Sequence, residues 1–203
     1  MKLYSYVVAR DFGFAPNPFY QFCTLGTCKP GIRNSAEVED WIVGTGSKSR
    51  RRKGHIVFVM RVTEVMQFNN YWSDSRFKQK KPNLRGSKKQ AFGDNIYYYD
   101  PATCEWHQED SHHSFPDGKP NEKNINHDTQ TDRVLISDDY IYWGGEGPQI
   151  PAKYRSFCGS DLCAGRGYKC NFPDNMVDEF VNWVRSLEVQ GYCGTPLDWS
   201  NSP

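Results

Sequence analysis

Two apolar stretches joined by a basic loop decide how the chain is expected to fold. The first stretch is Asp40-Trp41-Ile42-Val43, the loop is Gly44-Thr45-Gly46-Ser47-Lys48-Ser49-Arg50-Arg51-Arg52-Lys53, and the second stretch is His55-Ile56-Val57-Phe58-Val59-Met60-Arg61-Val62. Valine, isoleucine and aromatic residues dominate both stretches, which predicts two strands. The small residues of the loop let a ligand approach the backbone, and its four consecutive cations attract phosphate. The loop is therefore either a phosphate-binding segment or a solvated hairpin tip.

Length and composition favour one compact domain with a polar surface. The chain has 203 residues, enough to bury a sizeable core. Aromatic residues make up 15% of the chain although the mean hydropathy is −0.76, so many rings are expected at half-exposed surfaces and pockets. The net charge is only +1, so a polyanion would have to bind a local patch. No apolar run approaches the roughly 18 residues of a membrane helix, and the N-terminus does not resemble a signal peptide. A cytoplasmic protein with no membrane partner is predicted.

The seven cysteines are interpreted as free, reduced thiols. Cys158 and Cys163 are spaced C-x4-C, with Cys170 seven residues later, and Cys23 and Cys28 form a second C-x4-C pair. These spacings permit zinc, but neither pair has a matching second pair to complete a site. Buried thiols are the favoured interpretation, and no metal and no cofactor are expected. A zinc-stabilised interaction protein remains an alternative.

The alternation of apolar and polar residues predicts a strand-rich α+β chain. Strand patterns cover 3–9, 40–44, 55–65 and 133–137, with weaker ones at 20–28, 95–99, 140–143 and around Trp106. Helical spacing covers 68–78 and, more clearly, the segment from Pro173 to Leu187. The segment 78–90 is expected to be an extended loop, 110–132 a long polar loop, and the tail from Gly191 a loose strap. A curled sheet or small barrel with one or two flanking helices is predicted, as a single domain over 1–203.

The polar loop holds the candidate acid–base residues. Asp110-Ser111-His112-His113-Ser114 places two imidazoles beside a carboxylate, and His127-Asp128 follows. General acid–base catalysis needs one positioned histidine and an orienting carboxylate, which Asp110 or Asp128 could supply. On an extended segment adjacent side chains point to opposite faces, so only one of His112 and His113 could face a pocket. The common catalytic and nucleotide-binding motifs are absent. The alternative is a polar surface loop without a catalytic role.

Aromatic and amide residues near turns are candidates for binding a nucleotide. Nucleobases stack on exposed rings, and amides read base edges. Tyr71, Trp72, Tyr142 and Trp143 are the candidate stacking residues, although aromatic residues are more often core. A second basic segment at 78–89 could contact phosphates. The full candidate set is Asn17, Thr45, Gly46, Ser47, Lys48, Arg50, Arg51, Arg52, Tyr71, Trp72, Asn95, Tyr142 and Trp143.

Several long motifs resemble a known family. They are Tyr4-Ser5-Tyr6-Val7-Val8-Ala9-Arg10-Asp11, Ala15-Pro16-Asn17-Pro18-Phe19, Cys28-Lys29-Pro30, Asp40-Trp41-Ile42-Val43-Gly44-Thr45-Gly46, Phe92-Gly93-Asp94-Asn95-Ile96-Tyr97, Ser111-His112-His113, Val134-Leu135-Ile136-Ser137, Tyr142-Trp143-Gly144 and Cys163-Ala164-Gly165-Arg166-Gly167. Over nearly the whole chain these motifs resemble the nucleotide modification associated domain 2 (Nmad2-like) family, which implies a link to bacterial and phage systems that modify DNA bases. The order of strand, loop, strand and aromatic helix is also similar to the EVE and ASCH members of the PUA-like superfamily, which implies a small barrel with an aromatic base pocket.

Two hypotheses on function follow. The first is a PUA-like module that recognises a modified or flipped nucleotide, with nucleic acid or a nucleotide as its partner. The alternative is an enzyme that modifies a base, with His112 or His113 as the acid–base group and Asp110 or Asp128 as its orienting carboxylate. A deep aromatic pocket without histidine favours recognition, whereas a histidine–carboxylate pair that lines a pocket favours catalysis. The ligand and the oligomeric state stay open.

Overall fold

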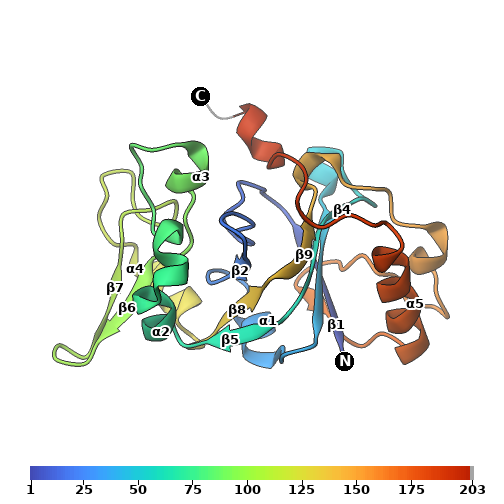
Figure 1. Ribbon diagram of the computed structural model, residues 1–203, viewed down its shortest axis with the longest axis horizontal. Coiled ribbons are helices and arrows are strands. Elements are labelled where there is room, and N and C mark those ends of the chain that lie inside the picture. Colours follow the sequence, from blue (N-terminus) through green and yellow to red (C-terminus); the bar gives the residue numbers. More distant parts are fainter. Residues whose placement is uncertain (202–203) are drawn as a thin grey trace. The chain divides into compact units, whose positions relative to one another are not determined.

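The computed structural model describes residues 1–201 and contains two compact units (Figure 1). The first unit combines residues 1–12, residues 36–63 and the described chain from Asp138 onward, and the second combines Gly13–Ser35 with Glu64–Ser137. Within the described residues, no helix is both long and apolar enough to cross a membrane. The organisation as one domain over 1–203 stays a prediction.

The first unit is built on a six-stranded mixed sheet with the order β10-β1-β3-β4-β9-β11. The strands are β1 (Leu3–Val8), β3 (Trp41–Gly46), β4 (Ile56–Arg61), β9 (Asp139–Tyr142), β10 (Tyr168–Lys169) and β11 (Gly191–Tyr192). β1 and β3 are parallel, whereas β3 pairs with β4, and β4 with β9, in antiparallel register. The predicted strands on either side of the basic loop are therefore confirmed.

The loop between β3 and β4 is folded against its own strand. It forms the 3₁₀ turn η1 (Lys48–Arg50), which ends at Arg51 in a left-handed conformation with φ 56°. Gly46 lies so close to the following backbone that an added Cβ would lie 2.3 Å from the carbonyl oxygen of Arg52. The small residue is thus needed for the close approach of two parts of the chain.

Helix α5 (Asp174–Arg185) packs on the sheet of the first unit. Its buried stripe consists of Met176, Val177, Phe180 and Val184, which join one apolar core with strand residues such as Trp41 and Val59. The short 3₁₀ segments of this unit are η3 (Gly144–Glu146), η4 (Ala152–Arg155) and η5 (Leu197–Asn201). The predicted helix is confirmed, because its spacing of apolar residues is the one that a helix on a sheet requires.

The expected loose tail is wrong for the described residues. β11 pairs with β9, and beyond it the backbone N–H of Leu197 donates to Asp11 Oδ2 at 3.0 Å. The indole N–H of Trp199 donates to the carbonyl of Phe12 at 2.8 Å. Two buried carboxylates, Asp11 and Asp198, therefore anchor a segment whose polarity suggested a solvated strap.

The second unit has a three-stranded antiparallel sheet and a separate hairpin. The sheet order is β2 (Cys23–Leu25), β8 (Val134–Ser137) and β5 (Glu64–Met66), and β6 (Tyr97–Asp100) pairs with β7 (Glu105–Gln108). Its helical segments are α1 (Pro30–Ser35), α2 (Phe68–Ser73), η2 (Ser75–Lys80), α3 (Lys88–Ala91) and α4 (Glu122–Asp128).

Several predicted boundaries need correction. The expected strand 55–65 is two strands, because β4 ends at Arg61 and β5 begins at Glu64 in another sheet. The expected helix 68–78 breaks at Asp74, whose extended backbone and side-chain bond to the N–H of Arg76 begin η2. The expected loops 78–90 and 110–132 contain the short helices α3 and α4.

The mixed α+β class is confirmed, but no closed barrel is present among residues 1–201. A barrel closes when the first and last strands of a sheet pair with each other. In the six-stranded sheet, the edge strands β10 and β11 have two residues each and lie at opposite edges of the sheet order. The sheet therefore stays open, and a PUA-like barrel is not found.

Candidate functional site

Cys28 occupies an unusual backbone position in the second unit. It lies between β2 and α1, with φ 57°, and the next residue, Lys29, has φ 44°. Residues other than glycine rarely adopt this left-handed backbone conformation, and residues with a strained backbone are enriched at functional sites. The thiol is only partly buried, whereas the thiol of Cys23 is fully buried. Cys28 therefore combines a strained backbone with a partly accessible thiol.

The thiol of Cys28 lies close to an imidazole and a carboxylate, with ligand atoms of all three within 4.8 Å of one another. Its Sγ is 3.7 Å from Nε2 of His113, and Nδ1 of His113 is 2.8 Å from Oδ2 of Asp128. The other oxygen, Asp128 Oδ1, accepts the backbone N–H of Cys28 at 2.8 Å. A nucleophile beside a base that a third group orients is the arrangement used in nucleophilic catalysis.

Asp128 is held rigidly in this arrangement. Its side chain is fully buried, and the hydroxyl of Tyr97 donates to Oδ2 at 3.0 Å. The buried guanidinium of Arg33 donates to the carbonyl of Asp128 and, at 2.8 Å, to the carbonyl of Cys28. One cation thus joins the backbone of Cys28 to that of Asp128 and fixes the two residues relative to each other.

His113 carries a proton at neutral pH. Burial disfavours the charged ring, but its hydrogen bonds to Asp128 and Cys28 outweigh burial and raise the pKa of His113 to about 9. A protonated imidazole stabilises a neighbouring thiolate, which is the reactive form of cysteine. The protonated ring of His113 therefore places a positive charge 3.7 Å from the sulfur of Cys28.

The two histidines are not on opposite faces. Residues 111–114 form a turn, closed by a bond from the N–H of Ser114 to the carbonyl of Ser111 at 3.0 Å, so the rule for extended segments does not apply. The rings of His112 and His113 both lie against Phe14, at 5.2 and 4.6 Å between centroids. The orienting carboxylate of His113 is Asp128. The carboxylate of Asp110 lies beside Gly118, where an added Cβ would be 3.0 Å from Oδ2. The catalytic role of Asp110, His112 and His113 stays a prediction.

Three of the candidate nucleotide-binding residues are buried in a polar network of the second unit. Asn17 accepts the ammonium of Lys80 at Oδ1, at 2.7 Å, and Lys80 is itself fully buried. The hydroxyl of Tyr71 donates to Asp94 Oδ1 at 2.8 Å, and Asn95 donates to the carbonyl of Tyr71 at 3.0 Å. Burial raises the pKa of Asp94, although Lys80 opposes this rise. These contacts hold Asn17, Tyr71 and Asn95 inside the second unit, and their nucleotide-binding role stays a prediction.

Trp72 is half-buried and stacked within the protein. The ring of Tyr98 lies 4.7 Å from it, and the ammonium of Lys81 lies 3.3 Å from its centroid. Tyr98 in turn stacks on His107 at 4.9 Å. A nucleobase would have to compete with these contacts, so the geometry favours a packing role for Trp72.

In the first unit, the basic loop is partly occupied by internal contacts. Arg50 pairs with the buried Asp198 at 2.6 Å, and Arg52 donates to the carbonyl of Gly147 at 2.7 Å. Lys48 and Arg51 are exposed, whereas Thr45, Gly46 and Ser47 are buried. Among the aromatic candidates, Tyr142 is fully buried and donates to Asp11, and Trp143 belongs to the apolar core. The structure does not gather these residues around one site, and their binding role stays a prediction.

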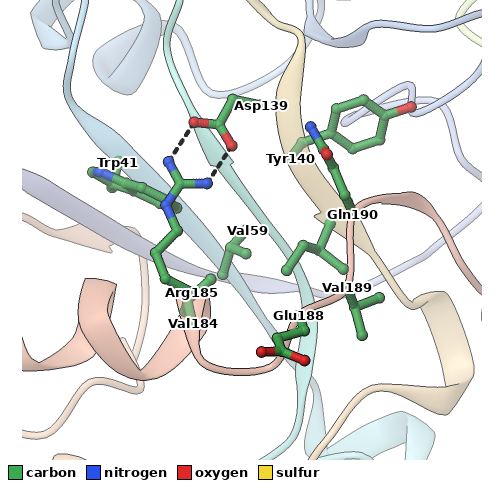
Figure 2. Close-up of a pocket in the computed structure, with 10 residues that line it drawn as sticks. Trp41, Val59, Asp139, Tyr140, Val184, Arg185, Glu188, Val189 and Gln190 are labelled. Atoms are coloured by element: carbon green, nitrogen blue, oxygen red, sulfur yellow. Dashed lines mark hydrogen bonds and ion pairs between the residues drawn. The ribbon is translucent and has the colours of Figure 1, made fainter.

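A separate pocket lies in the first unit (Figure 2). It encloses about 200 Å³ between α5, β9 and the chain after α5. At its wall, the guanidinium of Arg185 donates two hydrogen bonds to the carboxylate of Asp139, at 2.6 and 2.5 Å. Burial opposes the charge of Asp139, but Arg185 and Arg61 prevail and hold the pKa of its carboxyl below the usual range. The guanidinium of Arg185 also covers the ring of Trp41. The residues that line the pocket include no cysteine, serine, threonine or histidine.

Cys28, His113 and Asp128 are also the group with possible metal-binding chemistry. Within residues 1–201, ligand atoms of three histidine, cysteine or acidic side chains come within 4.8 Å of one another only at Cys28, His113 and Asp128. Since Nδ1 of His113 is bonded to Asp128, Cys28 Sγ and His113 Nε2 remain as direct ligands, fewer than zinc sites use. The zinc candidates Cys158, Cys163 and Cys170 do not form such a group.

The sequence predicts His113 and Asp128 as candidates but not Cys28, which stands there as half of a cysteine pair and in the family-like motif Cys28-Lys29-Pro30. Together, the fold and the site define an α+β protein with a thiol, an imidazole and a carboxylate close together in one unit. Residues 1–203 match the family model described as Nucleotide modification associated domain 2, and the chain belongs to this family. Membership associates it with nucleotide modification systems. Comparisons with curated proteins and with solved structures returned no match.

Proposed function

We propose that the chain is a cysteine-dependent enzyme that modifies a nucleotide. Cys28 is the nucleophile, His113 transfers the proton, and Asp128 orients the imidazole. The observation that carries this proposal is the proximity of Sγ, the imidazole and the carboxylate, with 3.7 Å from Sγ to Nε2 and 2.8 Å from Nδ1 to Asp128. The family supplies the substrate class, because its name ties it to nucleotide modification.

The proposed step is the addition of the thiol to a double bond in a base ring. Because His113 is already protonated near neutral pH, the thiol of Cys28 loses its proton to solvent, and the thiolate attacks an electrophilic ring carbon. The S–C bond forms as the ring π bond breaks, and the protonated imidazole then gives its proton to the neighbouring ring atom. Atoms and charge balance without a further reactant, and the adduct is a base activated for modification.

The backbone geometry favours a ring carbon over a carbonyl as the target. In acyl transfer, the N–H of the nucleophile often helps to bind the oxyanion. Here the N–H of Cys28 is already bound to Asp128 Oδ1 at 2.8 Å. Negative charge on a base ring is delocalised over ring heteroatoms, so this chemistry depends less on that donor.

Recognition of a modified or flipped nucleotide without chemistry is the second candidate. Its specific support is the group of rings around His112, which lies 5.2 Å from both Phe14 and Phe92. Such a module would bind nucleic acid equally well with serine at position 28. The two functions therefore differ in the need for the thiol.

Alkylation of the thiols tests the catalytic proposal. In wild-type protein treated with iodoacetamide near neutral pH, Cys28 should react faster than the exposed Cys104, although Cys28 is less accessible. His113→Gln should abolish this advantage, and His127→Gln, an exposed histidine on α4, is the matched control. Peptide mass spectrometry assigns each adduct to its cysteine. Equal rates at Cys28 in wild type and His113→Gln would contradict the proposal.

A further inference from the structure

The rings beside the proposed nucleophile form a compact cluster in the second unit. We call Phe14, Phe92 and His112 the ring cluster. The ring of His112 meets Phe14 and Phe92 edge-to-face, each at 5.2 Å between centroids. Phe14 is buried, Phe92 is half-buried and His112 is exposed. Because Phe14 is buried beneath the exposed ring of His112, the ring cluster offers a stacking surface to a nucleobase.

The ring cluster is fixed before any ligand binds. The side-chain amide of Asn17 donates to the carbonyl of Gly13 at 3.1 Å and to the carbonyl of Phe92 at 2.9 Å. Lys80 in turn donates to both oxygens of Asn17 and to the carbonyl of Phe22. The buried network therefore joins the two segments that carry the phenylalanines, and a preformed surface loses less entropy on binding.

The ring cluster also adjoins the nucleophile. Phe14 lies 4.6 Å from the ring of His113, and Nε2 of His113 lies 3.7 Å from Cys28 Sγ. The rings of His112 and His113 are nearly parallel, at 29° and 6.1 Å. A chain of contacts through the ring of His113 therefore connects His112 with the thiol of Cys28.

Exposed cations precede Phe92 in the chain. Lys88 and Lys89 lie on α3, which ends one residue before Phe92, and Lys78 and Arg85 are exposed in the same basic segment. The ammonium of Lys89 lies 5.7 Å from the ring of Phe19. These charges belong to the same unit as Cys28, unlike the basic loop at 48–53.

We infer that the ring cluster stacks a base of single-stranded nucleic acid while Lys88 and Lys89 contact its backbone phosphates. This inference rests on the proposed function, since it names the substrate that Cys28 acts on. A free base offers no phosphates to the cations, and an intact duplex buries the faces of its bases. An unpaired base within a polynucleotide strand meets both requirements.

Binding of labelled oligonucleotides tests the inference. Wild-type protein should bind single-stranded DNA or RNA of one mixed sequence, measured by fluorescence anisotropy, more tightly than the matching duplex. His112→Ala should weaken binding about 5- to 150-fold, as expected for the loss of one stacked base, and His112→Phe should restore it. Lys88→Ala with Lys89→Ala should lower the slope of log K against log salt by about 0.7 per lost phosphate contact.

Controls separate this inference from the proposed function. The exposed His127→Ala should leave binding unchanged, and His112→Ala should leave alkylation of Cys28 unchanged because the imidazole 3.7 Å from the thiol is that of His113. If His112→Ala binds like wild type while His113→Gln still slows alkylation, the ring cluster is not the stacking site and the catalytic proposal stands. If His112→Ala weakens binding while alkylation ignores His113, the stacking site stands and the chemistry does not. Tighter binding of the duplex, or no binding of either strand type at low salt, would overturn the inference.

Discussion

The two ring nitrogens of His113 face partners of different chemistry. Nδ1 lies 2.8 Å from a buried carboxylate, and Nε2 lies 3.7 Å from a half-buried thiol. Both partners favour the charged ring, so the proton that the addition step needs is already bound near neutral pH. The role of Asp128 is to keep that ring oriented, and Tyr97 and Arg33 keep Asp128 in place.

Stability should depend on pH through His113. The pKa of His113 in the folded protein, about 9, lies above the ordinary value of about 6.5. The stabilisation is therefore fully present below about pH 6.5 and is lost as the pH rises through about 9. Urea unfolding should show that His113→Gln is less stable than wild type at about pH 6 and that the difference narrows by about pH 9.5. A difference that stays constant would show that His113 is not charged in the folded state.

His113 and Asp128 could be proposed from the sequence because few residues supply imidazole and carboxylate chemistry. Cys28 could not, since seven thiols without a motif are equivalent in a sequence. Its role depends on a left-handed backbone and on partners 85 and 100 residues away in the chain. Only the fold brings these residues together.

Short helices position the site at the level of elements. Asp128 closes α4, and Arg33 on α1 donates to carbonyls of Cys28, Asp128 and Arg133. The sequence pattern predicted α5 and the long strands, because α5 buries one apolar stripe and β1, β3 and β4 are buried along nearly their whole length. It missed α3 and α4, which have four and seven residues and lie in polar sequence. Short elements depend on tertiary contacts more than on pattern.

Replacement of Arg33 should destabilise the second unit and disrupt the site. Arg33→Met leaves four carbonyls, those of Cys28, Asp128, Thr131 and Arg133, without this donor in a buried setting. We expect a loss of about 3–5 kcal/mol in the free energy of unfolding. Arg33→Lys should recover only part of this, because an ammonium cannot reproduce the planar fork of donors. Urea unfolding measures the loss, and alkylation of Cys28 in Arg33→Lys reports on the site. Wild-type stability in Arg33→Met would contradict this role.

At the scale of the whole molecule, two basic segments lie in different units and have different contacts. Segment 48–53 contains four consecutive cations, which made it a candidate phosphate-binding segment. The structure engages Arg50 with Asp198 and Arg52 with the carbonyl of Gly147, whereas Lys88 and Lys89 lie at the surface of the unit that carries Cys28. A run of charge in a sequence does not show which cations have carboxylate partners, because those partners are distant along the chain.

Arg50→Ala should therefore affect stability and not nucleic-acid binding. Its removal leaves the carboxylate of Asp198, which is 2% exposed, without its cation. Because Arg50 itself is one-third exposed, we expect a loss of only about 1–2 kcal/mol in the free energy of unfolding. The exposed Lys53→Ala is the control and should change stability by less than about 0.5 kcal/mol.

The double change at Lys88 and Lys89 should show the opposite pattern, with weaker nucleic-acid binding and an unchanged free energy of unfolding. If Arg50→Ala instead lowered affinity and the salt slope while unfolding stayed at the wild-type value, the phosphate site would lie in the basic loop at 48–53, and the assignment of phosphate contacts to α3 would be wrong.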